Sequence, residues 1–255
     1  MTEKELITRL KKLNIDITEK QLNQLNKYYE LLVEWNQKMN LTGITKKEDV
    51  YLKHFYDSAT ITKIIDLNKY DNLCDIGSGA GFPGIVLKIL FPNLKITLID
   101  SLNKRIKFLN MVIDNLELEN IKAIHTRAEE FALLNKEKYD IVTARAVAHL
   151  SILLEYGLPM LKINHYFIAM KGNLNNELDE SYNALKILNG KLDKIENFQL
   201  PKENSNRVLI KIKKEKPCSL KYPRKYSEIK KKRLWNFFFS LFKKNNWIIS
   251  QTIVS

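Results

Sequence analysis

Apolar residues recur at helical spacing near the start of the chain. Six of them are separated by three or four positions, which is typical of one face of an amphipathic helix. They are Leu22, Leu25, Tyr29, Leu32, Trp35 and Met39. Thr18 followed by Gln21 is a capping-box pattern that marks the start of this helix, and Thr45 with Glu48 repeats the pattern ahead of a shorter helical stretch. Residues 1–65 are therefore predicted to form an all-helical cap.

After Tyr70 the pattern changes to short apolar runs that alternate with helical stretches. The runs are NLCDI (72–76), KITLID (95–100), IKAIH (121–125), YDIVTA (139–144) and HYFIAM (165–170). Alternation of this kind predicts βαβ units and a parallel sheet. Segments 192–199 and 207–213 are expected to add an antiparallel pair at one edge. Residues 66–214 are thus predicted to form a Rossmann-like domain, followed by a basic, poorly ordered tail over 215–255.

The stretch DIGSGAGFPG, residues 75–84, contains two overlapping glycine motifs. Gly79, Gly81 and Gly84 spell the dinucleotide fingerprint G-x-G-x-x-G, whereas Gly77, Gly79 and Gly81 spell the D-x-G-x-G-x-G of adenosylmethionine-dependent methyltransferases. A nucleotide-binding turn needs its first glycine directly after the strand, where the chain reverses sharply. The strand NLCDI ends just before Gly77, so the second motif is favoured.

Asp100 ends the next predicted strand and is a candidate ligand for a ribose. A carboxylate at this position can accept hydrogen bonds from both ribose hydroxyls. S-adenosylmethionine carries a ribose but no pyrophosphate, so the following helix need not face an anion. The spacing from Gly77 to Asp100 therefore fits this cofactor.

Composition bounds the class of protein. A chain of 255 residues with 45% hydrophobic content fits one domain of about 200 residues with appendages. The longest apolar runs are shorter than the ~20 residues that span a bilayer, so a soluble, cytoplasmic protein without a membrane partner is expected. Cys74 and Cys218 are far apart and form no CxxC motif, which argues against a metal site and fits a reducing compartment.

The positive charge is concentrated near the C-terminus. The formal net charge is +13, and residues 201–232 contain twelve Lys or Arg against three Glu. Within this region YPRKYSEIKKK (222–232) alternates aromatic and basic residues, as RNA backbone patches do. The alternative is a solvated lysine tail. We expect an RNA partner, no DNA partner and a monomer.

Eight motifs, taken in order, resemble the 16S ribosomal RNA guanine-N7 methyltransferases called RsmG or GidB. They are EWNQKMNLTGIT, HFYDS, DIGSGAGFPGI, LIDSLNKRIKFL, RAEEF, TARAVAHL, AMKG and RVLIKIKK. The match covers about residues 15–232. The resemblance implies an α/β fold of the class I Rossmann-like methyltransferase type, with a seven-stranded, mostly parallel sheet and an N-terminal helical extension. It also implies 16S rRNA or the small ribosomal subunit as the partner.

The same resemblance implies a set of cofactor-binding residues. Gly77 and Phe82 are cofactor contacts, Ala128 with Glu129 forms the adenine-side contact, and Arg145 is a further cofactor-site residue. Glu129 and Arg145 also follow predicted strands at the carboxyl edge of the sheet, where open α/β folds bind ligands. The alternatives are an exposed helix-start glutamate and an arginine that is only solvated or paired.

Four other residues are weighed and left outside the site. His54 and Asp57 belong to the HFYDS motif, but a lone histidine on a capping helix is more often part of the packed structure. Arg105 lies at a basic helix start that either faces phosphate or is solvated. Cys218 lies far from the loop after YDIVTA, so it is not expected to be a nucleophile.

The sequence after strand YDIVTA bears on the reaction. It reads ARAV instead of the N-P-P-Y type turn that holds an exocyclic amine. Guanine N7 has an in-plane lone pair and no proton, so direct in-line attack needs no general base, and no catalytic residue is assigned. The alternatives are a class I methyltransferase acting on another RNA, a protein or a small molecule, and a non-catalytic Rossmann protein that binds RNA or NAD.

Residues 233–255 depart from the family pattern. The segments RLWNFFFSLF and NNWIISQTIVS have aromatic clusters but little periodicity and no cap. We therefore expect an accidental or weakly docked extension.

Overall fold

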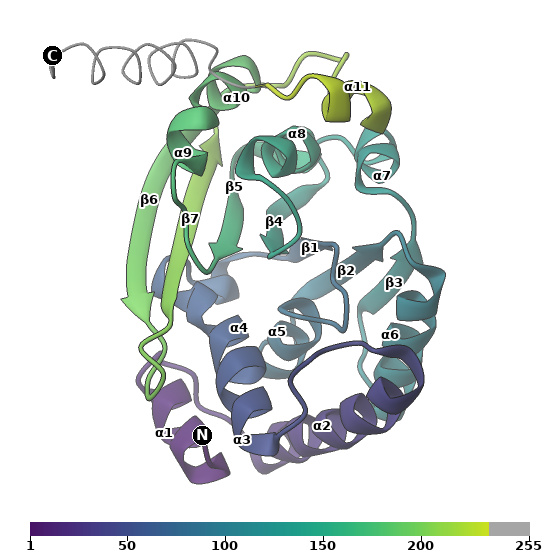
Figure 1. The fold of residues 1–255 in the computed structure, drawn as a ribbon, viewed down its shortest axis with the longest axis vertical. Coiled ribbons are helices and arrows are strands. Elements are labelled where there is room, and N and C mark those ends of the chain that lie inside the picture. The colour runs from purple at the N-terminus through teal and green to yellow at the C-terminus, as the bar shows by residue number, and fades with distance from the viewer. Residues whose placement is uncertain (235–255) are drawn as a thin grey trace, which may run out of the picture.

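A seven-stranded sheet forms the centre of the computed structural model, which describes residues 1–234 (Figure 1). The strand order is β3-β2-β1-β4-β5-β7-β6. Strands β1 to β5 pair in parallel, whereas β7 runs antiparallel to both β5 and β6. The strands are β1 Asn72–Ile76, β2 Lys95–Asp100, β3 Ile121–His125, β4 Tyr139–Arg145, β5 Leu161–Lys171, β6 Gly190–Gln199 and β7 Asn206–Lys214. This confirms the predicted α/β fold with a mostly parallel sheet.

Strands β1, β2 and β4 match the apolar runs, because nearly all of their residues are buried between the helices on the two faces. Strand β5 differs, since it begins at Leu161, four residues before the run HYFIAM. Its pairing with β4 shifts register between Tyr139 and Ile141, and residues 162–165 are partly or fully exposed. An exposed and partly polar strand start leaves no apolar run to recognise.

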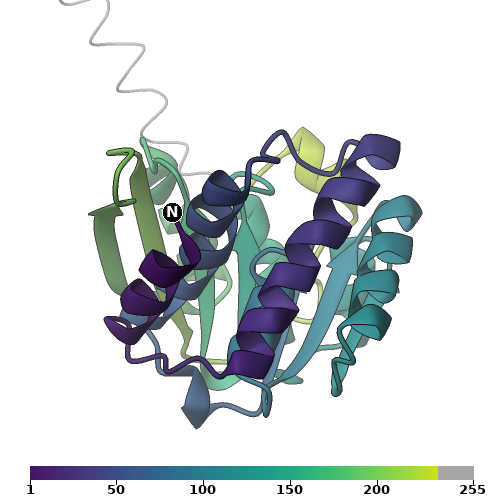
Figure 2. The same ribbon diagram turned by 90° about the horizontal axis from the view of Figure 1, so that it is seen from below.

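Helices cover the two faces of the sheet in two groups. The N-terminal helices, α5 and α6 share one hydrophobic core with one face, and Figure 2 shows the long helix α2 beside α6. Helices α7, α8, α10 and α11 belong to the core on the other face. The longer helices are α1 Glu3–Lys11, α2 Glu19–Met39, α5 Gly84–Leu90, α6 Asn103–Asn115, α7 Ala128–Leu134, α8 Leu150–Met160, α10 Tyr182–Ile187 and α11 Tyr226–Lys231.

The N-terminal region is helical, as predicted, but one of the two predicted caps is wrong. Thr18 and Gln21 form a reciprocal capping box at the start of α2. The second box does not form, because helix α3 (Lys47–Val50) begins after Lys46 and has no side-chain cap. Thr45 lies one residue too early for that role, and its carbonyl instead accepts a hydrogen bond from Tyr29 at 3.2 Å.

The rest of this region consists of short turns of helix that lead to β1. A π-helical segment covers Tyr51–Tyr56 and is followed by α4 Asp57–Ala59. Two 3-10 turns, Thr60–Lys63 and Leu67–Lys69, complete the connection. The π-helical segment carries the residues of the HFYDS motif, and most of its side chains are buried.

The segment 215–234 differs from the expected poorly ordered tail. Tyr222, Ile229 and Leu234 are buried in the core on the α8 face of the sheet. Arg224 pairs with the buried Glu155 of α8 through two 2.7 Å contacts, and its backbone N–H donates to the same carboxylate at 3.0 Å. This packing holds the segment against α8, and the number of charged residues in the segment does not reveal it. The expected extension after residue 234 lies outside the described residues.

None of the helices within residues 1–234 combines the length and apolarity needed to cross a bilayer. Within the same residues, no group of three or more His, Cys, Asp or Glu is arranged to hold a metal ion.

Candidate functional site

The loop after β1 adopts the conformation that the chosen glycine motif requires. Gly77, Gly79 and Gly81 have φ values of +66°, +59° and +97°, which non-glycine residues rarely adopt. A Cβ added at Gly77 would lie 2.8 Å from a methyl group of Val147, so the turn is also closely covered. Gly84 has no positive φ and instead packs against Leu98 at the start of α5. The three left-handed glycines are thus those of the methyltransferase motif.

Asp100 holds this glycine turn against the end of β2. Its Oδ2 atom accepts hydrogen bonds from the backbone N–H of Gly79 at 3.0 Å and from Arg105 at 3.2 Å. Its Oδ1 atom accepts from the N–H of Leu102 at 2.9 Å. The carboxylate is therefore fixed by two backbone groups, whereas its third contact is with the partly exposed side chain of Arg105, which a ligand hydroxyl can replace.

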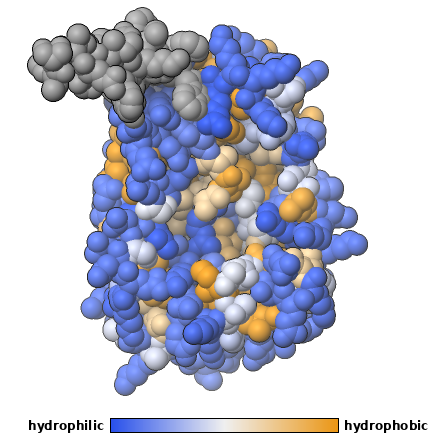
Figure 3. All heavy atoms as spheres, viewed as in Figure 1, coloured by the Kyte–Doolittle hydropathy of each residue, from blue (hydrophilic) through white to orange (hydrophobic). Residues whose placement is uncertain are grey.

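A cavity of about 420 Å³ opens at the carboxyl edge of the sheet beside this turn. Four of the predicted cofactor residues line it, namely Gly77, Phe82, Asp100 and Arg145. Thr42 and His54 of the N-terminal region form the opposite wall. Figure 3 shows a recess in the middle of the face that carries the ends of β4 and β5. The cavity volume lies within the range of about 300–1,000 Å³ that is typical of ligand pockets.

Arg145, at the end of β4, connects the sheet to the N-terminal region. Its Nη1 atom donates to the carbonyl of Lys53 at 3.1 Å and to Oδ2 of Asp57 at 3.2 Å. Its guanidinium lies 5.2 Å from the ring centre of Phe82. Burial lowers the pKa of Arg145, while the neighbouring carboxylate of Asp57 opposes this shift. The guanidinium is thus held by fixed partners, and Asp57 offsets part of its charge.

His54 lines the cavity, although it was not predicted to belong to the site. Its ring stacks on Phe82 with 4.3 Å between ring centres. Nδ1 lies 3.1 Å from Nη2 of Arg145 and 3.1 Å from the carbonyl oxygen of Lys53, and Nε2 lies 3.0 Å from Thr42 Oγ1, so both ring nitrogens have partners. Burial and the charge of Arg145 lower the pKa of His54 to about 3, so the ring is neutral. The HFYDS motif was the available signal for this residue.

The predicted adenine-side residues lie apart from the lining of this cavity. Ala128 and Glu129 begin α7, after β3, and neither lines the 420 Å³ cavity. The side chain of Glu129 is buried, and one of its carboxylate oxygens lies 4.0 Å from Arg127. Their role in binding a cofactor stays a prediction.

Asp75, the first residue of the glycine motif, is buried beneath the turn. Its Oδ2 accepts the N–H of Gly84 at 3.0 Å, and its Oδ1 has no hydrogen-bond partner among the described residues. Burial raises the pKa of this carboxyl to about 7. Asp75 therefore fixes the start of α5 and does not face the cavity.

The sheet order, the glycine turn and the strand-terminal Asp100 define the class as a Rossmann-like methyltransferase fold. A solved S-adenosylmethionine-dependent methyltransferase from Aquifex aeolicus has the same fold, with a TM-score of 0.51 and 16% identity over 71% of this chain and 98% of that one. A family model described as rRNA small subunit methyltransferase G matches residues 21–207. The chain belongs to this family, known as GidB, as the sequence motifs indicated.

Curated relatives agree with this assignment. The ribosomal RNA small subunit methyltransferase G of Exiguobacterium sibiricum is 50% identical over 228 residues, which cover 88% of this chain and 96% of the relative. The protein of the same name from Staphylococcus carnosus is 50% identical over 224 residues, or 86% of this chain and 93% of the relative. Binding of S-adenosylmethionine by this chain stays a prediction, which its membership of a methyltransferase family supports.

Proposed function

We propose that this protein transfers the methyl group of S-adenosylmethionine to N7 of a guanine in 16S rRNA of the small ribosomal subunit. The observation that carries the proposal is the cavity between the glycine turn, Asp100 and the HFYDS segment, in a chain that is 50% identical to small subunit methyltransferases. Membership of the family supports a ribosomal RNA substrate, and the geometry of the cavity supports methyl transfer from S-adenosylmethionine.

The cavity residues fit the cofactor chemically. Asp100 presents a nearly buried carboxylate for the ribose hydroxyls, and the partly exposed side chain of Arg105 can leave it. Ala128 and Glu129 lie beyond Asp100, on the β3 side, where an adenine would be held. Phe82 and Arg145 line the β4 side, where the methionine portion would lie. The cofactor supplies an electrophilic methyl group, and these residues bind and orient it.

The groups that line the cavity support transfer without a general base. Among the described lining residues His54 and Asp100 are the proton acceptors, and both are engaged. Both ring nitrogens of His54 have partners within the protein, and Asp100 accepts from two backbone N–H groups. Guanine N7 carries a free lone pair and needs no deprotonation. Catalysis then depends on holding N7 and the methyl carbon in line, which can contribute several kcal/mol.

The charge near Arg145 also suits this reaction. Positive charge moves from the sulfonium to the guanine ring during transfer, so an unbalanced cation beside the ring would oppose it. Oδ2 of Asp57 lies 3.2 Å from Arg145 and offsets part of its charge, since the same carboxylate also pairs with Arg207. Arg145 is therefore proposed to organise the cavity and to take no part in the bond changes.

Exposed cations of the C-terminal segment support an RNA partner. Lys225 and the run Lys230, Lys231 and Lys232 are exposed on or beside α11. Lysines on such a surface bind phosphates without reading sequence. Arg224 is excluded from this role because it is held in its ion pair with Glu155.

The test is methylation of small-subunit RNA from a strain that lacks the corresponding enzyme. The purified chain is incubated with S-adenosylmethionine and either naked 16S rRNA or the small subunit, and the nucleosides are identified by mass spectrometry. We expect one 7-methylguanosine per RNA. Methylation at another atom or on another substrate would favour a different class I methyltransferase, and failure to bind S-adenosylmethionine in calorimetry would favour the non-catalytic alternative.

A further inference from the structure

The start of helix α6 carries a cluster of cations beside the proposed cofactor cavity. Lys104 and Lys107 are exposed, whereas Arg105 is partly exposed and lines the cavity next to Asp100. The first turn of α6 contains no acidic residue. The helix dipole disfavours cations at this end, so helix stability does not account for the cluster.

Arg105 is held in the cavity by a single partner. Its Nη1 atom lies 3.2 Å from Oδ2 of Asp100, and within residues 1–234 its guanidinium has no other hydrogen bond or ion pair. By contrast, Arg145 in the same cavity is fixed through both Lys53 and Asp57. The Arg105 side chain is 37% exposed, so a change of partner requires the loss of only one partly exposed ion pair, which contributes little to stability.

Binding of a ribose at Asp100 requires this pair to break. An ionised carboxylate has about four acceptor positions. Among residues 1–234, the backbone N–H groups of Gly79 and Leu102 occupy two of them, and Arg105 occupies a third. One position is then left for the two ribose hydroxyls. Because the N–H groups belong to the glycine turn and to the residue before α6, Arg105 is the partner that can leave.

The released guanidinium lies where RNA has to approach. Arg105 is at the point where the cavity meets solvent, beside the exposed Lys104. An RNA that delivers a base to this cavity brings its phosphates to the same opening. Helix α6 itself offers no carboxylate before Asp114, nine residues further along. A guanidinium without a carboxylate partner can bind a phosphate through two parallel N–H donors.

We propose that Arg105 exchanges Asp100 for a phosphate of the RNA when S-adenosylmethionine binds. In the free protein the guanidinium is paired with Asp100, and in the cofactor complex it joins the surface formed by Lys104 and Lys107. This inference rests on the proposed function and gives its cofactor site a means of promoting RNA binding.

The exchange predicts positive coupling between the two ligands. RNA that binds the free protein either breaks the pair of Arg105 with Asp100 or forgoes its contact with Arg105, whereas RNA that binds the cofactor complex does neither. The coupling is limited by the strength of that pair, so we expect an effect of about two- to fivefold in affinity. Linkage makes the effect reciprocal, so RNA raises the affinity for the cofactor by the same factor.

The first test measures RNA affinity with and without S-adenosylhomocysteine, which has the ribose but transfers no methyl group. The purified protein is titrated with unmodified 16S rRNA from a strain that lacks the corresponding enzyme. The wild type should bind this RNA about two- to fivefold more tightly when the analogue is present. Arg105→Gln should bind it equally in both conditions. With the analogue, the log–log salt slope of Arg105→Gln should be smaller than that of the wild type by somewhat under one unit, as expected for one lost phosphate contact.

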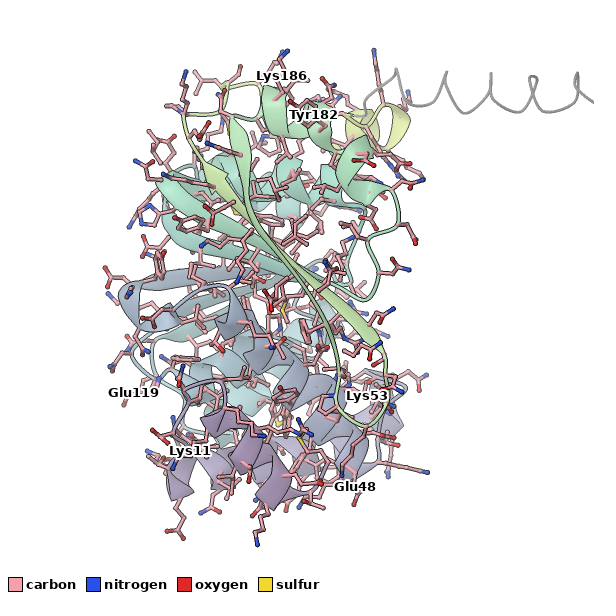
Figure 4. All side chains as sticks on the ribbon, turned by 90° about the vertical axis from the view of Figure 1, so that its left-hand side faces the viewer. Lys11, Glu48, Lys53, Glu119, Tyr182 and Lys186 are labelled. Atoms are coloured by element: carbon pink, nitrogen blue, oxygen red, sulfur yellow. The ribbon has the colours of Figure 1, made fainter. Side chains whose placement is uncertain are left out.

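Two exposed lysines provide the controls. Lys104→Gln removes a neighbouring charge that is not paired with Asp100, so this variant should retain the effect of the analogue. Lys186→Gln removes a charge from α10, which Figure 4 shows at the end of the molecule away from the N-terminal helices. It should equal the wild type in both conditions. If Lys104→Gln also loses the effect of the analogue, the coupling is not specific to Arg105 and the inference is overturned.

The second test measures cofactor affinity in the absence of RNA. Arg105→Gln lacks the group that the ribose displaces, so it should bind S-adenosylmethionine about two- to fivefold more tightly than the wild type in calorimetry. Arg105→Lys keeps the charge beside Asp100 and should bind the cofactor as the wild type does. A residue that only supports the shape of the cavity would have the opposite effect, because its loss weakens binding.

Three results would overturn the inference. They are equal RNA affinity of the wild type with and without the analogue, weaker cofactor binding by Arg105→Gln, and equally tight cofactor binding by Arg105→Lys and Arg105→Gln. Formation of 7-methylguanosine tests the proposed function separately. A wild type that methylates N7 without coupling keeps the proposed function and loses the inference, whereas one that shows coupling but methylates another atom does the reverse.

Discussion

Asp100 shows how a single side chain can both build a loop and present a ligand group. Two of its hydrogen bonds go to backbone N–H groups of the glycine turn and of Leu102, so its carboxylate is fixed before a ligand arrives. Its third partner, Arg105, has a partly exposed side chain. A ribose that displaces Arg105 would therefore bind a preorganised acceptor and lose little conformational entropy.

Replacing Asp100 with asparagine should weaken cofactor binding strongly. The variant keeps the size of the side chain but loses the negative charge and one acceptor oxygen. Hydrogen bonds to charged groups contribute about 1.5–3 kcal/mol, so we expect the Kd for S-adenosylmethionine to rise about ten- to a hundredfold in calorimetry. Asp114→Asn, at an exposed position of α6, is the matched control. Equal affinities of the two variants would contradict the proposed ribose contact.

His54 should make stability depend on pH in mildly acidic solution. Burial, assisted by Arg145, lowers its pKa to about 3, whereas an unfolded histidine titrates near about 6.5. As the pH falls from about 6.5 toward 3, the unfolded chain binds a proton that the folded chain does not bind. The stability contributed by His54 is therefore complete above pH 6.5 and is lost below it, by up to about 1.4 kcal/mol per pH unit.

The measurement compares urea denaturation of the wild type and His54→Gln across this pH window. The variant should lose less stability on acidification than the wild type does. The comparison between proteins is needed because Asp75, with a pKa raised to about 7, changes stability in the opposite sense in the same window. His125→Gln, at an exposed position, should behave as the wild type does. Parallel pH profiles for His54→Gln and wild type would show that His54 is not the group responsible.

Four residues that line the cavity were predicted from the sequence, whereas His54 was not, and the reason is physical. Gly77 and Asp100 follow strands at the carboxyl edge, so strand assignment alone brings them together, and the family motifs added Phe82 and Arg145. His54 reaches the same cavity through packing of a π-helical segment against Phe82. Tertiary contacts of this kind leave no periodic signal, because the local residues form the same buried turn whether or not it adjoins a cavity.

At the level of elements, helix α2 positions the glycine turn from outside the Rossmann core. The hydroxyl of the fully buried Tyr28 donates a hydrogen bond to the carbonyl of Ala80, and its ring packs 5.4 Å from that of Phe82. The turn is thus held by α2 on one side and by β2 on the other. The periodic pattern predicted α2 and its start at Thr18, but it could not indicate that this helix supports the turn after β1.

The C-terminal segment and α8 form a second coupling between elements. Glu155 is buried in α8, and its carboxylate receives Arg224 in a bidentate pair together with a backbone N–H. The sequence placed Arg224 among phosphate-binding cations because charge clustering does not distinguish a buried pair from an exposed patch. Local composition therefore predicted correctly that this surface is positively charged, but it could not assign the role of each cation.

Arg224→Gln should destabilise the protein, whereas Lys225→Gln should not. Removing one partner of a buried ion pair leaves Glu155 uncompensated, which costs about 3–5 kcal/mol. Lys225 is exposed, so its neutralisation should change the unfolding free energy by less than about 0.5 kcal/mol. Chemical denaturation measures both values. If the two variants are equally stable, the segment 215–234 does not depend on this ion pair for its packing.

For the whole molecule, the two hydrophobic cores explain which parts of the chain act together. The N-terminal helices share a core with α5 and α6, and the C-terminal segment shares the other core with α8. Both regions that the sequence separated from the central domain are thus packed against it. Hydrophobic patterning predicted the strands of the sheet and the helices between them. The packing of the two terminal regions on the faces of the sheet depends on contacts between segments distant in sequence.

The same packing defines where the chain can be shortened. Leu234 is buried in the core that includes Tyr222 and Ile229, so a deletion that begins at residue 233 would remove a core side chain. A deletion of residues 235–255 leaves the sheet, both cores and the proposed cofactor cavity complete within the remaining residues. We therefore expect the shorter deletion to preserve the melting temperature, cofactor affinity and methyl transfer.

The longer deletion, from residue 233, should lower the melting temperature by several degrees. Burying a leucine contributes about 1.5–3 kcal/mol, and this contribution is lost only when Leu234 is removed. The two truncations differ by two residues, so they share any effect of removing the remaining sequence. Scanning calorimetry of both proteins beside the full chain separates the two contributions. A large loss of stability or activity in the 235–255 deletion itself would show that those residues are an integral part of the folded protein.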